Sequence, residues 1–146
     1  MKNVLFTMLL LAGFTIALQA QQKVRVKDKD LPSAIQSNFK TEFPDARDAE
    51  WIQKDGHYKV EFEVNDVDNI AAFDADGKLI SKGIEIKQAD IPAAITSAVQ
   101  AGYAGKAIDE VYKVEKDGKT HYLVELKGDT DTKILYSADG QLIKEK

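Results

Sequence analysis

The residues best suited to chemistry are the only two histidines of the chain, His57 and His121, which stand in equivalent positions beside two Asp-Gly turns. A histidine becomes catalytic when a nucleophile or metal ligands converge on it. The sequence contains no serine elbow, no glycine-rich phosphate loop and no histidine cluster with metal-ligand spacing. We therefore expect no enzymatic activity and no cofactor.

The composition excludes several further classes of protein. The chain has 146 residues and no cysteine, with 20 Lys+Arg against 24 Asp+Glu and a formal net charge of −4. Disulfide scaffolds and thiolate metal sites both need cysteine. Nucleic-acid-binding proteins usually carry an excess of basic residues, so we expect no nucleic-acid partner. The length suits about one domain.

The first twenty residues have the shape of a secretory signal peptide. Lys2 precedes an apolar run over residues 4–18, and a polar stretch begins after Ala20. An uncleaved anchor is the alternative, but a membrane-spanning helix needs about 20 apolar residues. We expect cleavage after Ala20, a periplasmic or secreted protein, and no membrane insertion after cleavage.

The rest of the chain contains two copies of one sequence repeat. Residues 30–35 recur at 90–95, residues 54–56 at 116–118, residues 57–61 at 121–125, and residues 73–80 at 136–143. The second copy gains two residues on each side of its first Asp-Gly, which lengthens both arms of a hairpin and leaves every side chain on its original face. We predict an N-terminal extension at 21–29, a first repeat at 30–88 and a second repeat at 89–146.

Each repeat predicts one helix followed by a meander of strands. Pro32 opens the first helix, and Ile35, Phe39 and Phe43 form one apolar stripe along it. The Asp-Gly pairs at 55–56 and 117–118 have the composition of type I′ hairpin turns. We therefore predict an α+β fold, in which two tandem repeats build one antiparallel sheet with helices on one face only.

Two-residue turns also predict which residues lie opposite each other. On the side facing the helices we expect Trp51–Val60, Gln53–Tyr58, Ala49–Phe62 and Val111–Val124. On the other side we expect Lys54–His57, Ile52–Lys59, Glu50–Glu61, Asp48–Glu63, Val114–His121, Tyr112–Leu123 and Glu110–Glu125.

These repeated motifs resemble the PepSY-like family of exported bacterial proteins. The shared features are a helix opening with Asp-(Leu/Ile)-Pro, a strand reading Tyr-x-Val-Glu, and a turn reading aromatic-x-Ala-Asp-Gly, at residues 73–77 and 136–140. The family is similar in architecture to beta-lactamase inhibitor protein, which is stapled by disulfides that this chain lacks. The resemblance implies a non-enzymatic module with an open, slightly concave sheet face that holds a partner.

Apolar residues on that open face are the first candidate site. We expect Tyr112, Val114, His121, Leu123 and Leu135, with Asp117 at the hairpin tip, to bind a partner, because apolar residues framed by charge often mark contact surfaces. Two simpler explanations remain open. A few exposed aliphatic residues are normal, and the two units could use these side chains on each other.

Acidic residues on the same face are the second candidate. Asp48, Glu50, Glu61 and Glu63 cluster around the first hairpin, and Glu110 lies opposite Glu125. Like charges directly opposed are destabilising, so these carboxylates could serve a cation or a basic partner. Alternatively, lysines of neighbouring strands such as Lys59, Lys113 or Lys133 neutralise them, and we assign no metal on this basis.

The sequence therefore predicts an exported non-enzymatic binding module with a protein partner in the cell envelope, which it binds through the open sheet face and whose hydrolase activity it could restrain. The alternative is a periplasmic protein that binds a small molecule or a cation such as calcium.

Overall fold

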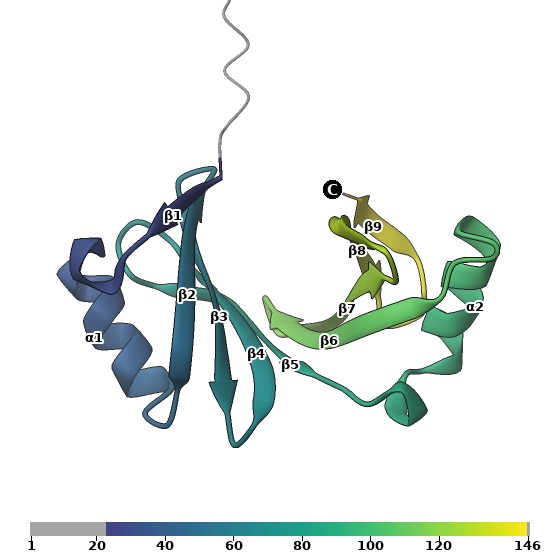
Figure 1. The fold of residues 1–146 in the computed structure, drawn as a ribbon, viewed down its shortest axis with the longest axis horizontal. Coiled ribbons are helices and arrows are strands. Elements are labelled where there is room, and N and C mark those ends of the chain that lie inside the picture. The colour runs from purple at the N-terminus through teal and green to yellow at the C-terminus, as the bar shows by residue number, and fades with distance from the viewer. Residues whose placement is uncertain (1–22, 146) are drawn as a thin grey trace, which may run out of the picture.

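The predicted α+β fold is confirmed, because the described residues form two α-helices and a single antiparallel sheet of nine strands in the order β1 to β9 (Figure 1). The computed structural model describes residues 23–145, apart from the side chains of 129–131 and 145. The predicted signal peptide at 1–20 lies outside the described residues. The strands are β1 (Val24–Val26), β2 (Arg47–Lys54), β3 (His57–Val64), β4 (Val67–Phe73), β5 (Leu79–Glu85), β6 (Ile108–Lys116), β7 (Lys119–Leu126), β8 (Asp129–Ser137) and β9 (Leu142–Glu145), and the helices are α1 (Ser33–Glu42) and α2 (Ala93–Gly102).

Helices α1 and α2 begin after Pro32 and Pro92, as the repeated Asp-(Leu/Ile)-Pro motif predicts. A single 3-10 turn precedes each helix, at Asp28–Asp30 and Gln88–Asp90. Both helices cover the same face of the sheet and lie on its outer flanks, so the sheet bends around its helix-free face (Figure 1). No helix within residues 23–145 is long and apolar enough to cross a bilayer.

The type I′ turns are confirmed by the backbone. A type I′ turn needs positive φ at both central residues, and φ is +55° at Asp55 and +74° at Gly56, with +52° and +70° at the equivalent residues 117 and 118. Asn65 and Asp66, at +53° and +61°, form a further two-residue turn between β3 and β4 that the sequence analysis did not identify.

Most predicted cross-strand pairs are confirmed, from Glu50–Glu61 to Lys54–His57 and from Glu110–Glu125 to Val114–His121. Two are wrong. A β-bulge in β2 places Arg47 opposite Glu63, so Asp48 does not pair with Glu63 and Ala49 does not pair with Phe62. Asp48 has φ +52°. An extra residue of this kind shifts the register by one, which the spacing of turn residues cannot reveal.

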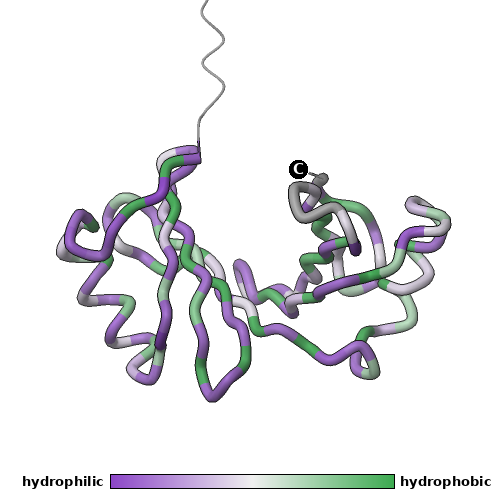
Figure 2. The backbone as a smooth tube through the Cα atoms, in the orientation of Figure 1, coloured by the Kyte–Doolittle hydropathy of each residue, from purple (hydrophilic) through white to green (hydrophobic). Residues whose placement is uncertain are grey.

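Two separate hydrophobic cores lie between the helices and the sheet. In the first, Phe39 of α1 packs edge-on against Trp51 and Phe62, with ring centroids 5.0 and 5.1 Å away. In the second, the equivalent Val99 packs with Ile95 and with residues of β6, β7 and β8. We call the first core and its elements unit 1 and the second unit 2. Hydrophobic and hydrophilic residues alternate along the strands, as expected when one face of a sheet is covered (Figure 2).

Strand β5 belongs to both units. Residues 79–84 pair with β4 and close unit 1, while residues 81–85 pair with β6. The pairing of Ile84 with Lys113 and of Glu85 with Tyr112 repeats, sixty residues later, the pairing of Val24 with Gln53 and of Arg25 with Ile52. The end of β5 is therefore the β1 equivalent of unit 2.

Each helix rests on a glycine in the turn that follows the fourth strand of its unit. A Cβ on Gly77 would lie 2.9 Å from the backbone carbon of Ala34, and a Cβ on Gly140 would lie 2.6 Å from the backbone oxygen of Ala94. These distances explain why both Asp-Gly turns and both small helical residues recur in the repeat.

We expect Gly140→Ala to destabilise the protein by about 3 kcal/mol, because the methyl group overlaps the α2 backbone and φ is +84°. Gly118→Ala is the matched control, since its φ is +70° but nothing lies within 4 Å. That variant should lose only about 1 kcal/mol. Urea unfolding of both variants measures the difference, and equal losses would show that the helix contact is unimportant.

Candidate functional site

The helix-free side of the sheet, which we call the open face, carries every second residue of the central strands. It is lined by Glu61, Glu63, Asp68, Ile70, Gly83, Glu85, Glu110, Tyr112, Val114, His121, Leu123, Glu125, Lys133 and Leu135. This face brings together all the predicted partner-binding residues except Asp117, which lies at the exposed tip of the β6–β7 hairpin.

Three of the predicted residues form one cross-strand row. Tyr112 pairs with Leu123, and Leu123 pairs with Leu135, so the row runs directly from β6 to β8. Leu123 and Leu135 are partly exposed. The alternation of residues along the strands predicts that these three side chains lie together on the open face, and the apolar row confirms it.

Tyr112 and Val114, by contrast, offer little surface, with exposed fractions of 6% and 8%. A Cβ on Gly83 would lie 2.9 Å from Ile70 and 3.0 Å from Val114, so the missing side chain lets these two residues approach each other across β5. The units therefore use part of the open face on each other, which is one of the two simpler explanations considered from the sequence.

His121 is partly buried beside Val114 and Ser137. Its Nδ1 atom is buried without a hydrogen-bond partner in the described part of the chain. The other histidine, His57, is exposed in the β2–β3 hairpin of unit 1. The two imidazoles thus belong to different units.

Lys133 bridges the two units across the open face. Its Nζ lies 2.6 Å from Oε1 of Glu125 in unit 2 and 3.3 Å from Oε1 of Glu61 in unit 1. Burial lowers the pKa of Lys133, but hydrogen bonds and attraction from the two glutamates outweigh it and raise the pKa above its ordinary value. Lys133 is one of the lysines predicted to neutralise the acids of this face, and for Glu61 and Glu125 the prediction is confirmed.

The other predicted acids do not converge. Glu50 lies 3.6 Å from Arg25 of β1, and Asp48 lies in the bulge. Among the described residues there is no group of three or more His, Cys, Asp or Glu side chains close enough to hold a metal ion. The proposed carboxylate cluster of Asp48, Glu50, Glu61 and Glu63 is therefore spread over the strands.

Glu110 is the carboxylate most affected by its surroundings. Its pKa is raised first by burial and next by the charge of Glu125, while the Tyr112 hydroxyl, which donates a hydrogen bond of 3.2 Å to Oε2, opposes the shift. Glu85 and Asp68 raise it further. Burial also raises the pKa of Tyr112, which stays a hydroxyl donor.

The longer β6–β7 hairpin has a role that the insertions did not reveal. Its extra length pairs Lys116 with Ser81 and Glu115 with Lys82 of β5, and its tip lines a pocket of about 360 Å³ with residues 79–82.

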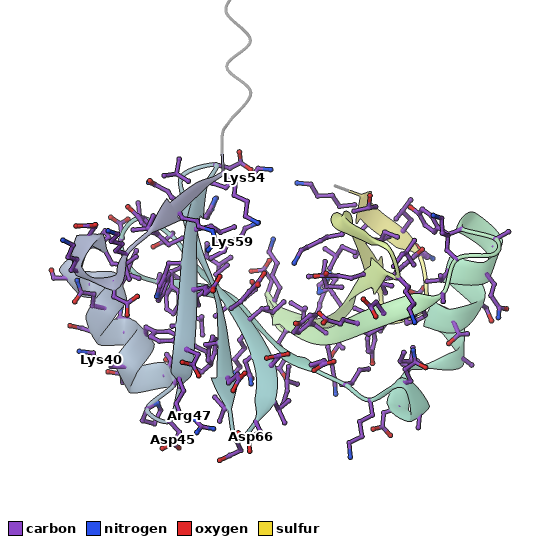
Figure 3. The ribbon with its side chains drawn as sticks, in the orientation of Figure 1. Lys40, Asp45, Arg47, Lys54, Lys59 and Asp66 are labelled. Carbon is purple, nitrogen blue, oxygen red and sulfur yellow. The ribbon has the colours of Figure 1, made fainter. Side chains whose placement is uncertain are left out.

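A second pocket, of about 560 Å³, lies at the far end of unit 1, where Arg47 and Asp66 form an ion pair of 2.8 Å (Figure 3). Lys54 and Lys59 lie towards the other end of β2 and β3 (Figure 3).

The fold and the open face define a protein of two α+β units that share one sheet and leave one of its faces uncovered. The chain belongs to the family described as "Putative beta-lactamase-inhibitor-like, PepSY-like", which matches residues 17–81 and 56–144. Two matches agree with the two repeats found in the sequence. Among curated proteins, none gives a significant match.

Several solved structures share the fold. One, called a "putative periplasmic" protein, from Bacteroides eggerthii, is 20% identical with a TM-score of 0.63, and the match covers 80% of this chain and 88% of that one. Another, called BLIP-like, from Bacteroides fragilis, is 24% identical with a TM-score of 0.54, covering 80% and 85%. A protein from Bacteroides uniformis is 23% identical with a TM-score of 0.60, covering 79% and 88%.

We expect Lys133→Met to cost about 2 kcal/mol, because it leaves the Glu125 carboxylate, which is only 13% exposed, without its cation. The double variant Glu125→Gln with Lys133→Met should recover most of this loss, since the carboxylate that Lys133 neutralised is then gone as well. Lys40→Met, on exposed α1, is the control and should change stability by less than about 0.5 kcal/mol. A double variant as unstable as the single one would contradict the ion pair's role.

Glu110→Gln should raise the melting temperature at pH 7. A carboxyl group whose folded pKa is above its unfolded value, 4.5, costs stability once it is ionised, and the cost fades as the pH falls through that range. The advantage of the variant should therefore be greatest at neutral pH and disappear near pH 4. A melting-temperature difference that grows on acidification would show that the pKa is lowered.

Proposed function

We propose that this chain is an exported, non-enzymatic binding module that docks a protein partner on its open face and restrains a hydrolase of the cell envelope. Export rests on the predicted signal peptide at 1–20, and on fold neighbours one of which is called periplasmic. Binding rests on the open face, and restraint of a hydrolase rests on the inhibitor-like description of the family.

The observation that carries the proposal is the apolar row of Tyr112, Leu123 and Leu135 on a sheet face that no helix within residues 23–145 covers. Tyr112 is buried at the β6 end of the row, whereas Leu123 and Leu135 remain partly exposed. Apolar side chains in a continuous row, framed by the charges of Glu125 and Lys133, suit the desolvated centre and polar rim of a protein interface.

A catalytic role finds no support in the histidines. His57 and His121 lie in different units, and neither imidazole is hydrogen-bonded to another side chain within the described residues. Catalysis by histidine needs a partner that orients it or receives its proton. We therefore propose that the open face binds a partner without catalysing a reaction.

Leu123→Arg with Leu135→Arg should abolish binding of the partner, because two charges replace the apolar centre of the interface. Ile84→Arg is the matched control, since Ile84 is an aliphatic residue that is 47% exposed on the opposite face of the sheet. The three proteins are immobilised and exposed to envelope extract, and retained proteins are identified by mass spectrometry.

Support requires one discrete protein that is retained by the wild type and the Ile84 variant but is lost from the double variant. Retention by all three proteins, or loss from the Ile84 variant alone, would place binding elsewhere. The melting temperatures of the variants show whether each is folded.

A further inference from the structure

Three carboxylates form a second cross-strand row on the open face. Glu63 of β3 pairs directly with Asp68 of β4, and Glu85 of β5 is the next neighbour, since the adjacent Asn69 pairs with Ile84. Directly opposed side chains on neighbouring strands lie about 5 Å apart. Like charges at that separation destabilise the free protein, so the row works against folding.

None of these three carboxylates forms an ion pair with another described residue. Arg47, which pairs with Glu63 across β2 and β3, forms its ion pair with Asp66 instead. Lys133 is engaged by Glu61 and Glu125. Asp68 is exposed, and Glu63 and Glu85 are partly so, which leaves the carboxylates open to an external positive charge.

The acidic row continues directly into the apolar row. Glu85 pairs with Tyr112, Tyr112 with Leu123, and Leu123 with Leu135. One line of neighbouring side chains thus crosses six strands, acidic on β3 to β5 and apolar on β6 to β8. The line is extended, whereas a metal ion needs ligands gathered around one point.

From this line we infer that the partner presents a cationic protein segment to the open face, with lysine or arginine over Glu63, Asp68 and Glu85 and aliphatic side chains over Leu123 and Leu135. The inference rests on the proposed function, because it names the chemistry of the partner that the same face binds. A cationic partner neutralises these carboxylates when it binds and so removes their mutual repulsion. Electrostatic complementarity of this kind explains why the free protein keeps three like charges side by side.

The test uses cyclic β-hairpin peptides with arginine and leucine alternating on one face, and the same peptides with glutamate in place of arginine. Binding to the full exported chain is measured by fluorescence anisotropy. The triple variant Glu63→Gln, Asp68→Asn, Glu85→Gln should bind the arginine peptide at least about tenfold more weakly than the wild type. The control Glu42→Gln, Asp109→Asn, Glu115→Gln removes three exposed acids that lie outside the acidic row and should bind within about twofold of the wild type.

Equal weakening by both triple variants would show that only net charge matters and would overturn the inference. Binding of the glutamate peptide as tightly as the arginine peptide, or of neither peptide, would overturn it as well. Asp68→Asn alone should weaken binding to an intermediate extent. The first triple variant should also melt at a higher temperature than the control, because its opposed charges are gone, and a lower melting temperature would contradict the repulsion.

The two proposals fail in different ways. If the envelope partner is lost on Leu123→Arg with Leu135→Arg but is retained by the acidic-row variant, the open face is the binding site and the partner is not cationic. If both variants retain the partner and the Ile84 variant loses it, the open face is not the binding site at all.

Discussion

Strand β5 must close one unit and begin the next, and the rest of the molecule depends on that double role. Its pairing with β4 and with β6 is the continuous backbone connection between two hydrophobic cores that share no buried residue. Gly83, in the middle of the strand, lets Ile70 and Val114 approach each other across it. A larger residue there would force these two side chains apart, so we attribute the tight bend of the sheet around its open face to this glycine.

The bend decides which residues of the open face remain available. On β6, beside β5, Tyr112 and Val114 are buried, and Lys133 of β8 joins acids of both units. Leu123, Leu135 and the row of Glu63, Asp68 and Glu85 stay at least partly exposed and are accessible to another molecule. A row of neighbouring carboxylates that form no ion pair with the described residues is a local conflict with stability, and conflicts of this kind are expected where a protein binds something else.

Much of this arrangement follows from the sequence, because the repeated motifs contain residue types that favour one backbone conformation. Glycines after Asp, prolines before the helices and alternating apolar residues predict the turns, the helix starts and most of the register. The bulge at Asp48, strand β1 and the burial of Tyr112 could not be predicted, since each depends on contacts between strands that are distant in sequence. The row of Asp68 and Glu85 could not be predicted for another reason, because the Asp-Gly turns at 55–56 and 117–118 set the register within their own hairpins and not that of β4 with β5 or of β5 with β6.

The central claim is that the open face, and not the helical side, holds the partner. A photo-activated crosslinking amino acid placed at position 123 tests this most directly, with the same amino acid at position 84 on the opposite face as the comparison, both irradiated in intact cells that export the chain. We expect one discrete crosslinked product from position 123 and none from position 84. A product from position 84 alone would contradict this account.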